Sequence, residues 1–440
     1  MTNSIQSENF QLHGPFAQLL TMDNLPLRGA LCDEQLEIIT NAGIIVQDGV
    51  IIEIGNYNAL KHKYSRLKNF QFSIFNFQLN SVCLPAFIDS HTHICWAGSR
   101  AKDCAMRLSG KSYLEIAAAG SGIWDTVTKT RAATLDELVK LTVARADELY
   151  SQGVGTIEVK SGYGLSVESE LKILEAIRLA NAQTPADLIP TCLAAHIVPP
   201  LLTSPKGRNS TVLTNASIMA NVSSPSFGGG WGEVDYLQML VEELLPEIKR
   251  RNLCNRVDIF VEQSAFSVSA ARKYLLKAKE MGFDVLLHGD QFTAGAAALA
   301  AEVGALSIDH LEAADDREIS TLAQSNVIPV ALPAASLGLG DRFAPARRLL
   351  DAGCSLAIAS DYNPGTAPMG NLPASAAILG ANQRLTMAET LAAITFRAAT
   401  ALRLTDRGIL KRGNRADFIV FNTNDYREIL YRQGGLMPVR

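Results

Sequence analysis

The 440-residue chain lacks long hydrophobic runs and clusters of basic residues. No stretch of about 18 residues is apolar enough to cross a bilayer, which argues against a helical membrane protein. The formal net charge is −4 and Lys and Arg form no run, so we expect neither nucleic acid nor an anionic membrane as a partner. The first residues contain no basic segment followed by an apolar one, so we expect no secretory signal and a cytoplasmic location.

Cysteine pairs and phosphate-binding glycine motifs are missing as well. The seven cysteines are scattered, odd in number and form no C-x-x-C pair. This pattern excludes a disulfide framework and a structural zinc knuckle, and it favours reduced thiols. No G-x-G-x-x-G motif follows the first strand of the repeating pattern described below, which weakens a dinucleotide-binding open sheet. With 48% hydrophobic and 19% charged residues, the composition suits a soluble protein with a large core and permits an enzyme.

From about residue 82 to 400, apolar strand-like runs alternate with amphipathic helical stretches. This repeat, about eight strand-helix units, predicts an α/β fold of the (β/α)₈ TIM-barrel type over residues 81–404. The two ends of the chain, 15–80 and 405–440, have strand composition, and the turn dipeptide Asp48-Gly49 predicts a hairpin. Neither end is large enough to be stable alone, so we expect both to join in a small β-sandwich. Residues 201–232 are rich in Ser, Asn and Gly, which predicts an insertion.

Histidine is scarce, and its positions are informative. Five of the seven histidines follow the carboxyl ends of expected barrel strands, namely His91, His93, His196, His288 and His310. Those strand ends converge on the face of a barrel that carries the active site. His91 and His93 follow the buried run 82–88, expected to form one strand, and alternation along an extended chain points both to one side.

These positions predict a divalent metal site. His91 and His93 supply two ligands, His288 is the natural third, and Asp361, which ends another apolar run, is the fourth. A cation acidifies bound water, and a carboxylate beside it can move the proton. Simpler roles remain open for three residues: His310 could cap the following helix, Asp361 could belong to a turn, and Cys95 could be a ligand or, as we favour, a buried bystander.

The motifs around these residues resemble one known family. They are HICWAGSR, EVKSGYGL, LAAHIVPP, FVEQSAF, HGDQ, SIDHLE, ASDYNPGT and RADFIV. Together they resemble the imidazolonepropionases of the amidohydrolase superfamily, from about residue 30 to the C-terminus apart from the insertion. The resemblance implies hydrolysis of 4-imidazolone-5-propanoate to N-formimidoyl-L-glutamate in histidine degradation. It also implies a homodimer and one zinc or iron ion per chain.

The resemblance assigns roles to residues of this chain. It makes His91, His93, His288 and Asp361 the metal ligands. The chemistry of the side chains adds the catalytic pair: Asp361 would take the proton of the water, and His310 could polarise the carbonyl. The substrate-binding residues that it implies are Arg100, Tyr163, His196, Gln291, Asn363, Gly365 and Thr366. A guanidinium suits the substrate's propionate, although a surface salt bridge is the alternative for Arg100. Gln291 cannot titrate, so it would bind and not act as a base.

Several alternatives stay open at this stage. Lys160 could be a carboxylated bridge between two metals, with His196 as a second-site ligand, although one metal is favoured. The insertion could be a lid or, as we favour, a passive loop. Another cyclic-amide or amidine hydrolase or deaminase of the same superfamily is the nearest competing function. A non-catalytic scaffold with a relic metal site is a third reading, and it would predict the loss of a ligand.

Overall fold

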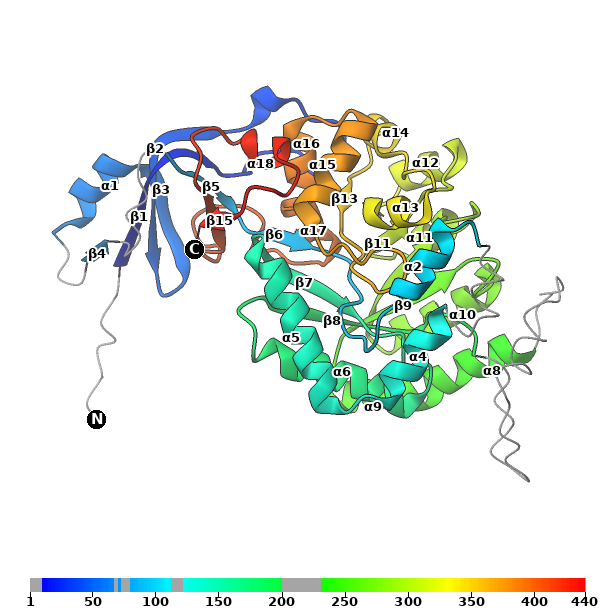
Figure 1. Cartoon of the computed structure of the whole chain (residues 1–440). Coiled ribbons are helices and arrows are strands. Elements are labelled where there is room, and N and C mark those ends of the chain that lie inside the picture. The colour runs from blue at the N-terminus through cyan, green and yellow to red at the C-terminus, as the bar shows by residue number, and fades with distance from the viewer. Residues whose placement is uncertain (1–9, 67–69, 73–79, 112–121, 200–230, 440) are drawn as a thin grey trace, which may run out of the picture.

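The computed structural model describes residues 10–66, 70–72, 80–111, 122–199 and 231–439. They form two sheets, a mixed sheet from both ends of the chain and a parallel sheet of eight strands closed into a barrel (Figure 1). The expected insertion at 201–232 lies outside the described residues except for its last two. In the part of the chain that the structure describes, no helix is both long and apolar enough to cross a membrane.

The mixed sheet joins the two ends of the chain, as predicted. Its strands run in the order β15-β14-β5-β1-β2-β3, with β4 also pairing with β1. Asp48 and Gly49 both have positive φ and connect β2 to β3 as the predicted hairpin. The strands are β1 (Phe10–Leu20), β2 (Ile38–Gln47), β3 (Val50–Asn56), β4 (Phe70–Phe72), β5 (Val82–Pro85), β14 (Phe418–Phe421) and β15 (Pro438–Val439).

The barrel confirms the predicted fold class. Its strands lie in sequence order, each parallel to the next. They are β6 (Phe87–Asp89), β7 (Val154–Lys160), β8 (Asp187–Ala195), β9 (Arg256–Val261), β10 (Asp284–Gly289), β11 (Ser307–His310), β12 (Ile328–Ala331) and β13 (Ala357–Ile358).

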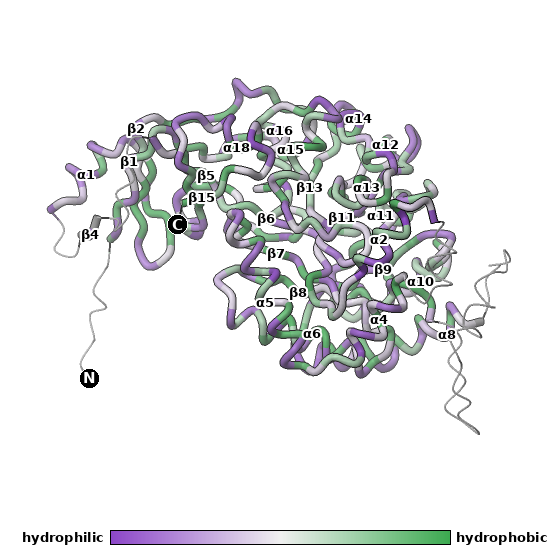
Figure 2. The backbone as a smooth tube through the Cα atoms, viewed as in Figure 1, coloured by the Kyte–Doolittle hydropathy of each residue, from purple (hydrophilic) through white to green (hydrophobic). Residues whose placement is uncertain are grey.

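Helices surround the barrel. Hydrophobic residues run along the strands and hydrophilic ones gather on the outer turns (Figure 2), because each helix buries only one face. The helices between β6 and β9 are α2 (Ala101–Leu108), α4 (Ile123–Ala132), α5 (Leu135–Ser151), α6 (Val167–Asn181), α8 (Trp231–Met239) and α9 (Leu245–Arg251). The later ones are α10 (Val268–Glu280), α11 (Ala297–Val303), α12 (Asp316–Ala323), α13 (Pro333–Leu339), α14 (Ala346–Asp351), α15 (Leu372–Gln383), α16 (Met387–Ala393) and α17 (Phe396–Ala401). The short helix α1 (Tyr57–Tyr64) packs on the mixed sheet, and another, α18 (Glu428–Tyr431), follows β14 in the chain and packs on α15.

The apolar run 82–88 does not form the single strand that we expected. It divides at Ala86 into β5, which pairs with β1 and β14 in the mixed sheet, and β6, which begins the barrel. Pro85 lies at the division, and a proline within a strand-like run interrupts its hydrogen-bond ladder. β5 therefore lies within the range 81–404 expected for the barrel but belongs to the other sheet. The proposed domain limits themselves stay a prediction.

The barrel closes through the segments that carry the expected metal ligands. Beyond the ends of β6 and β13, the Asp361 amide donates to the His91 carbonyl and the His93 amide donates to the Tyr362 carbonyl, each at 3.0 Å. Thr92 and Tyr362 form a parallel bridge at the same place. This closing seam fixes the backbone of His91, His93 and Asp361 together, although they are some 270 residues apart in sequence.

Candidate metal centre and active site

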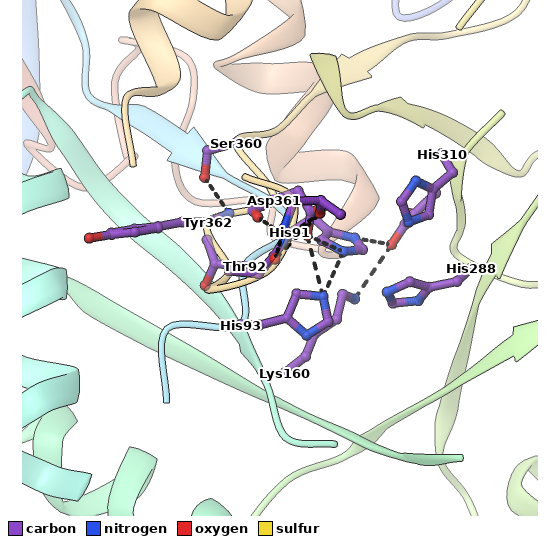
Figure 3. A network of polar contacts seen from close by, with 12 residues as sticks. His91, Thr92, His93, Lys160, His288, His310, Ser360, Asp361 and Tyr362 are labelled. Atoms are coloured by element: carbon purple, nitrogen blue, oxygen red, sulfur yellow. Dashed lines mark hydrogen bonds and ion pairs between the residues drawn. The ribbon is translucent and has the colours of Figure 1, made fainter. Parts of the chain in front are cut away.

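The five histidines selected from the sequence meet at one end of the barrel. The ring centroids of His91 and His288 lie 4.5 Å apart, and those of His288 and His310 lie 5.5 Å apart. The rings of His93 and His196 stack at 5.4 Å with an interplanar angle of 17°. Figure 3 shows four of these rings around Asp361 and Lys160. The strand ends thus converge as a barrel requires, and the expectation drawn from spacing holds for all five.

The expected metal ligands form a compact group. The ligand atoms of His91, His93 and His288 all lie within 4.8 Å of one another. Asp361 Oδ1 lies 3.5 Å from His91 Nε2 and 3.4 Å from His93 Nε2. All four side chains are buried. Three imidazoles and one carboxylate converging on a point match the ligand set of a catalytic divalent cation that keeps a position for water.

The chemistry of these groups also fits a metal. Burial, followed by nearby positive charges, lowers the pKa of His91 and His93 far below the usual range. The rings are therefore neutral, as ligands must be. His288 Nε2 is buried and has no hydrogen-bond partner among the described residues. A buried polar atom without a partner is costly, and a cation at this point would satisfy it.

Asp361 occupies a strained position. Its φ is +50°, a conformation that few non-glycine residues adopt. Burial raises the pKa of its carboxyl to about 7, against the opposing charge of His310. Backbone strain of this kind persists only where the surroundings enforce it, and here the closing seam does so. Asp361 lies just beyond the end of β13 and beside the histidines, as its place after an apolar run predicts.

His310 has a different environment from the other histidines. Its φ is +89°, and its Nδ1 lies 3.5 Å from Glu312 Oε2. Burial lowers the pKa of His310, but the negative charges of Glu312 and then Asp361 raise it by more. The pKa of His310 therefore lies above its ordinary value. The alternative of helix capping is wrong, because Asp315 caps α12 through the Arg317 and Glu318 amides. A histidine that favours its charged form can donate to a carbonyl oxygen.

The segment after β7 forms the tight loop expected from its glycines. Gly162 has a φ of +115°, and a side chain there would meet Leu193 O at 2.8 Å. This close approach lets His196 Nδ1 contact Gly162 O at 3.2 Å and places Tyr163 at 4% exposure. The rings of Tyr163 and His196 lie 5.6 Å apart. Two residues expected to bind substrate are thus neighbours at the metal centre.

Glu170 of α6 holds this loop, and we did not predict it from the sequence. It is fully buried, and its carboxylate accepts the amides of Gly162, Gly164 and Leu165 at 2.7–3.0 Å. The sequence indicated this role of Glu170 only weakly. Glu170 lies four positions after the helix cap Ser166, and acidic residues also occur on exposed first turns of helices.

Replacing Glu170 with alanine should destabilise the protein by about 3 kcal/mol or more, because three buried amides lose a charged acceptor. Urea unfolding followed by circular dichroism measures this change. The matched control is Glu168→Ala on the exposed side of the same helix, expected to stay within about 0.5 kcal/mol of the parent. Equal stability of the two variants would show that the loop does not depend on Glu170.

Arg100, expected to bind the propionate, lies close to a loop expected to complete the substrate pocket. Arg100 donates from Nε to Asp103 at 2.8 Å and is 12% exposed, so it is not the surface salt bridge of our alternative. A side chain on Gly365 would approach Arg100 Nη1 to 2.5 Å, so glycine at 365 admits the guanidinium. Asn363 accepts the amides of Gly365 and Thr366 at 2.7 and 2.8 Å and donates to Thr366 Oγ1 and to Asp361 O. Its amide thus shapes the loop, and direct binding of substrate by Asn363 stays a prediction.

Two other expectations concern single residues. Gln291 is 9% exposed and follows β10, three residues after His288, but among the described residues it makes no hydrogen bond to the metal ligands. Cys95 is buried against α6, where its Sγ lies 3.9 Å from Ile173 O, so it is the expected bystander.

A buried charge cluster under the histidines was not predicted as a unit. Lys160 Nζ lies 2.8 Å from Glu158 Oε1 and from Asp258 Oδ2, and 3.4 Å from Asp309 Oδ2. Burial opposes the charge of Lys160, but the three carboxylates, Asp258 first, raise its pKa above the ordinary value. A carboxylated lysine forms from the neutral amine, so this environment argues against a bridging carbamate. The signal was present: acidic residues occur within the apolar strands EVK, VDIF and SIDH.

Comparison with known proteins decides the family. A model of the amidohydrolase family matches residues 114–431. An imidazolonepropionase from Myxococcus xanthus is 40% identical over 352 residues, which cover 80% of this chain and 77% of that protein. Another from Deinococcus radiodurans is 37% identical over 425 residues, 96% of each chain. The chain belongs to the imidazolonepropionase family of amidohydrolases.

Solved structures of more distant amidohydrolases share the fold. A mutant atrazine chlorohydrolase from Arthrobacter aurescens TC1, complexed with zinc and atraton, superposes with a TM-score of 0.62 at 16% identity, over 94% of this chain and 87% of that one. An adenosine deaminase from Xanthomonas campestris with bound zinc gives a TM-score of 0.62 at 16% identity, over 98% and 89%. At this identity the likeness concerns the fold alone, and it supports the family's barrel and terminal sheet.

Proposed function

We propose that this enzyme hydrolyses the cyclic amide of 4-imidazolone-5-propanoate to N-formimidoyl-L-glutamate, using one zinc or iron ion per chain. The observation that carries the proposal is the joint placement of the His91, His93, His288 and Asp361 cluster with a shielded Arg100. Relatives named imidazolonepropionase, alike over most of their length, support the same substrate. The free cysteines are consistent with the cytoplasm, and the family resemblance supports a homodimer.

The chain's own groups suit each part of this reaction. The Arg100 guanidinium binds the propionate, and Tyr163 and His196 orient the ring from the neighbouring loop. His310 donates to the ring carbonyl as charge develops on its oxygen. Asp361 accepts the proton of the attacking water and delivers it to the ring nitrogen as the carbon-nitrogen bond breaks. When bound, a divalent cation at the four ligands supplies Lewis acidity and makes the water more acidic.

A hydrolysis assay tests the proposal directly. Metal-analysed protein is mixed with freshly made 4-imidazolone-5-propanoate, and the loss of imidazolone absorbance is followed together with the product mass. Turnover with about one metal ion per chain is expected. A fully metallated chain that leaves this substrate intact would refute the proposal and favour another cyclic-amide or amidine substrate. Light scattering of the same sample tests the homodimer.

Replacing Arg100 with alanine should raise KM by about 10- to 100-fold with a smaller change in kcat, since a charged hydrogen bond to bound substrate contributes about 1.5–3 kcal/mol. Steady-state kinetics measure both constants. Arg100→Lys keeps the charge but loses the forked geometry, so its KM should be intermediate. Arg412→Ala, exposed beyond the mixed sheet, is the control. An unchanged KM for Arg100→Ala would place propionate binding elsewhere.

A further inference from the structure

Four charged side chains lie inside the barrel with no exposure at all. They are Glu158, Lys160, Asp258 and Asp309, from the alternate strands β7, β9 and β11. Withdrawing charges from water is expensive, and a barrel interior is ordinarily filled by branched apolar side chains. Three carboxylates around one ammonium at this depth therefore require a role beyond packing.

Two of these carboxylates connect the ammonium to metal ligands. Asp309 Oδ2 lies 2.7 Å from His91 Nδ1 and 3.4 Å from Lys160 Nζ. Asp258 Oδ2 lies 3.0 Å from His288 Nδ1 and 2.8 Å from the same Nζ. In both cases one carboxylate oxygen faces a histidine and Lys160 together. The third carboxylate, Glu158, contacts Lys160 and pairs with no histidine of the described chain.

These contacts determine which nitrogen each histidine presents. Asp309 is hydrogen-bonded to His91 Nδ1 and keeps the proton there, so the lone pair is on Nε2. The contact of Asp258 with His288 Nδ1 is an ion-pair distance of 3.0 Å without hydrogen-bond alignment, and the carboxylate charge favours the proton on the same nitrogen. His91 Nε2 lies 3.2 Å from His93 Nε2, and His288 Nε2 is free among the described residues, as the metal site requires. Figure 3 shows Lys160 reaching up between these rings from below.

The ammonium also occupies the place of a second cation. Asp258, His288 and Asp309 form a second group whose ligand atoms lie within 4.8 Å of one another. Lys160 Nζ contacts both carboxylates of that group. The positive charge of Lys160 offsets negative charge on Asp258 and Asp309. These two carboxylates can therefore hold the ligands His288 and His91 in place without a second metal ion.

We propose that Lys160 is a positioning residue of the metal centre: one ammonium holds Asp258 and Asp309, and through them presents Nε2 of His288 and His91 to the metal. This inference rests on the ligand set of the proposed function, but not on its substrate. Lys160 touches neither the metal nor the substrate. It acts by keeping two imidazoles in one tautomer and one orientation before the metal arrives.

The test compares metal affinity in two variants of the same cluster. Lys160→Met keeps the length of the side chain and removes its charge, and Glu158→Gln removes a carboxylate that contacts Lys160 and Thr191 but, among the described residues, pairs with neither His91 nor His288. Each full-length protein is stripped of metal and titrated with Zn²⁺ against a competing chelator. Loss of a partner behind a ligand typically weakens metal binding by about 10- to 100-fold, and we expect this for Lys160→Met. Glu158→Gln should stay within about threefold of the parent, well below that range.

A second readout separates positioning from general damage. Nitrogen-15 NMR of metal-free, histidine-labelled protein reports the tautomers, and we expect the protonated-Nδ1 form for His91 and His288 in the parent and a mixture in Lys160→Met. If that variant does not fold, Lys160→Met/Glu158→Gln preserves the cluster's net charge and should show the same two changes. Parent-like zinc affinity, or an equal loss in Glu158→Gln, would overturn the inference. A parent that binds zinc but does not hydrolyse the imidazolone would refute only the substrate.

Discussion

His288→Ala is expected to remove metal binding and turnover together. His288 supplies the one ligand from the side of the barrel opposite the closing seam, and its buried Nε2 has no other partner among the described residues. Loss of a direct ligand should weaken binding by more than the roughly 10- to 100-fold typical of an indirect partner. Elemental analysis of the purified variant, and zinc titration against a chelator, measure the loss.

Two histidine variants serve as controls for this experiment. His62→Ala, exposed on α1 next to the mixed sheet, should keep full metal content and full activity. His196→Ala should keep the metal, since its ring stacks on His93 and its Nδ1 faces Gly162, but it should lose activity through weaker substrate binding. Full metal occupancy in His288→Ala would contradict the ligand assignment. Loss of metal in His196→Ala would show that His196 is also a metal ligand.

The ligands could be predicted from the sequence because barrel geometry is repetitive. Side chains at the carboxyl ends of all eight strands face one opening, so a count of histidines at strand ends was enough to place five of them together. The strand limits mattered little: His310 is the last residue of β11 and does not follow it, yet it faces the same opening. The division of 82–88 between two sheets was missed because hydrophobicity is the same on both sides of Ala86.

Residues that act through other residues were harder to predict. Glu170 and Asn363 act by accepting hydrogen bonds from backbone amides. The sequence alone does not show which loop folds back onto these side chains. The charges of the barrel interior were visible as acidic residues in apolar strands, but which carboxylate meets which histidine depends on the register between β9, β10 and β11. Long-range pairing of this kind is fixed by the closed sheet and not by local pattern.

Asp361→Asn should lower kcat by about 10²- to 10⁴-fold, the usual contribution of a positioned acid-base group. Asparagine keeps the size and one oxygen of the side chain, so it can still approach the metal, but it cannot accept the water's proton. Steady-state kinetics on metal-analysed protein measure the change, and rates are compared per bound metal ion. Asp136→Asn, exposed in the first turn of α5, is the matched control and should behave as the parent.

The pair of variants at 288 and 361 separates binding from chemistry. His288→Ala removes a ligand and should empty the site, whereas Asp361→Asn should retain much of its metal and lose rate, because the carboxylate does two jobs and the amide can do only one. Both variants should lose activity, so activity alone would not distinguish them. The amount of metal bound per chain does. Parent-like turnover of Asp361→Asn at full metal content would show that another group accepts the proton of the water. His310 would then be the first to examine, since its ring lies 5.5 Å from His288 and its Nδ1 faces Glu312.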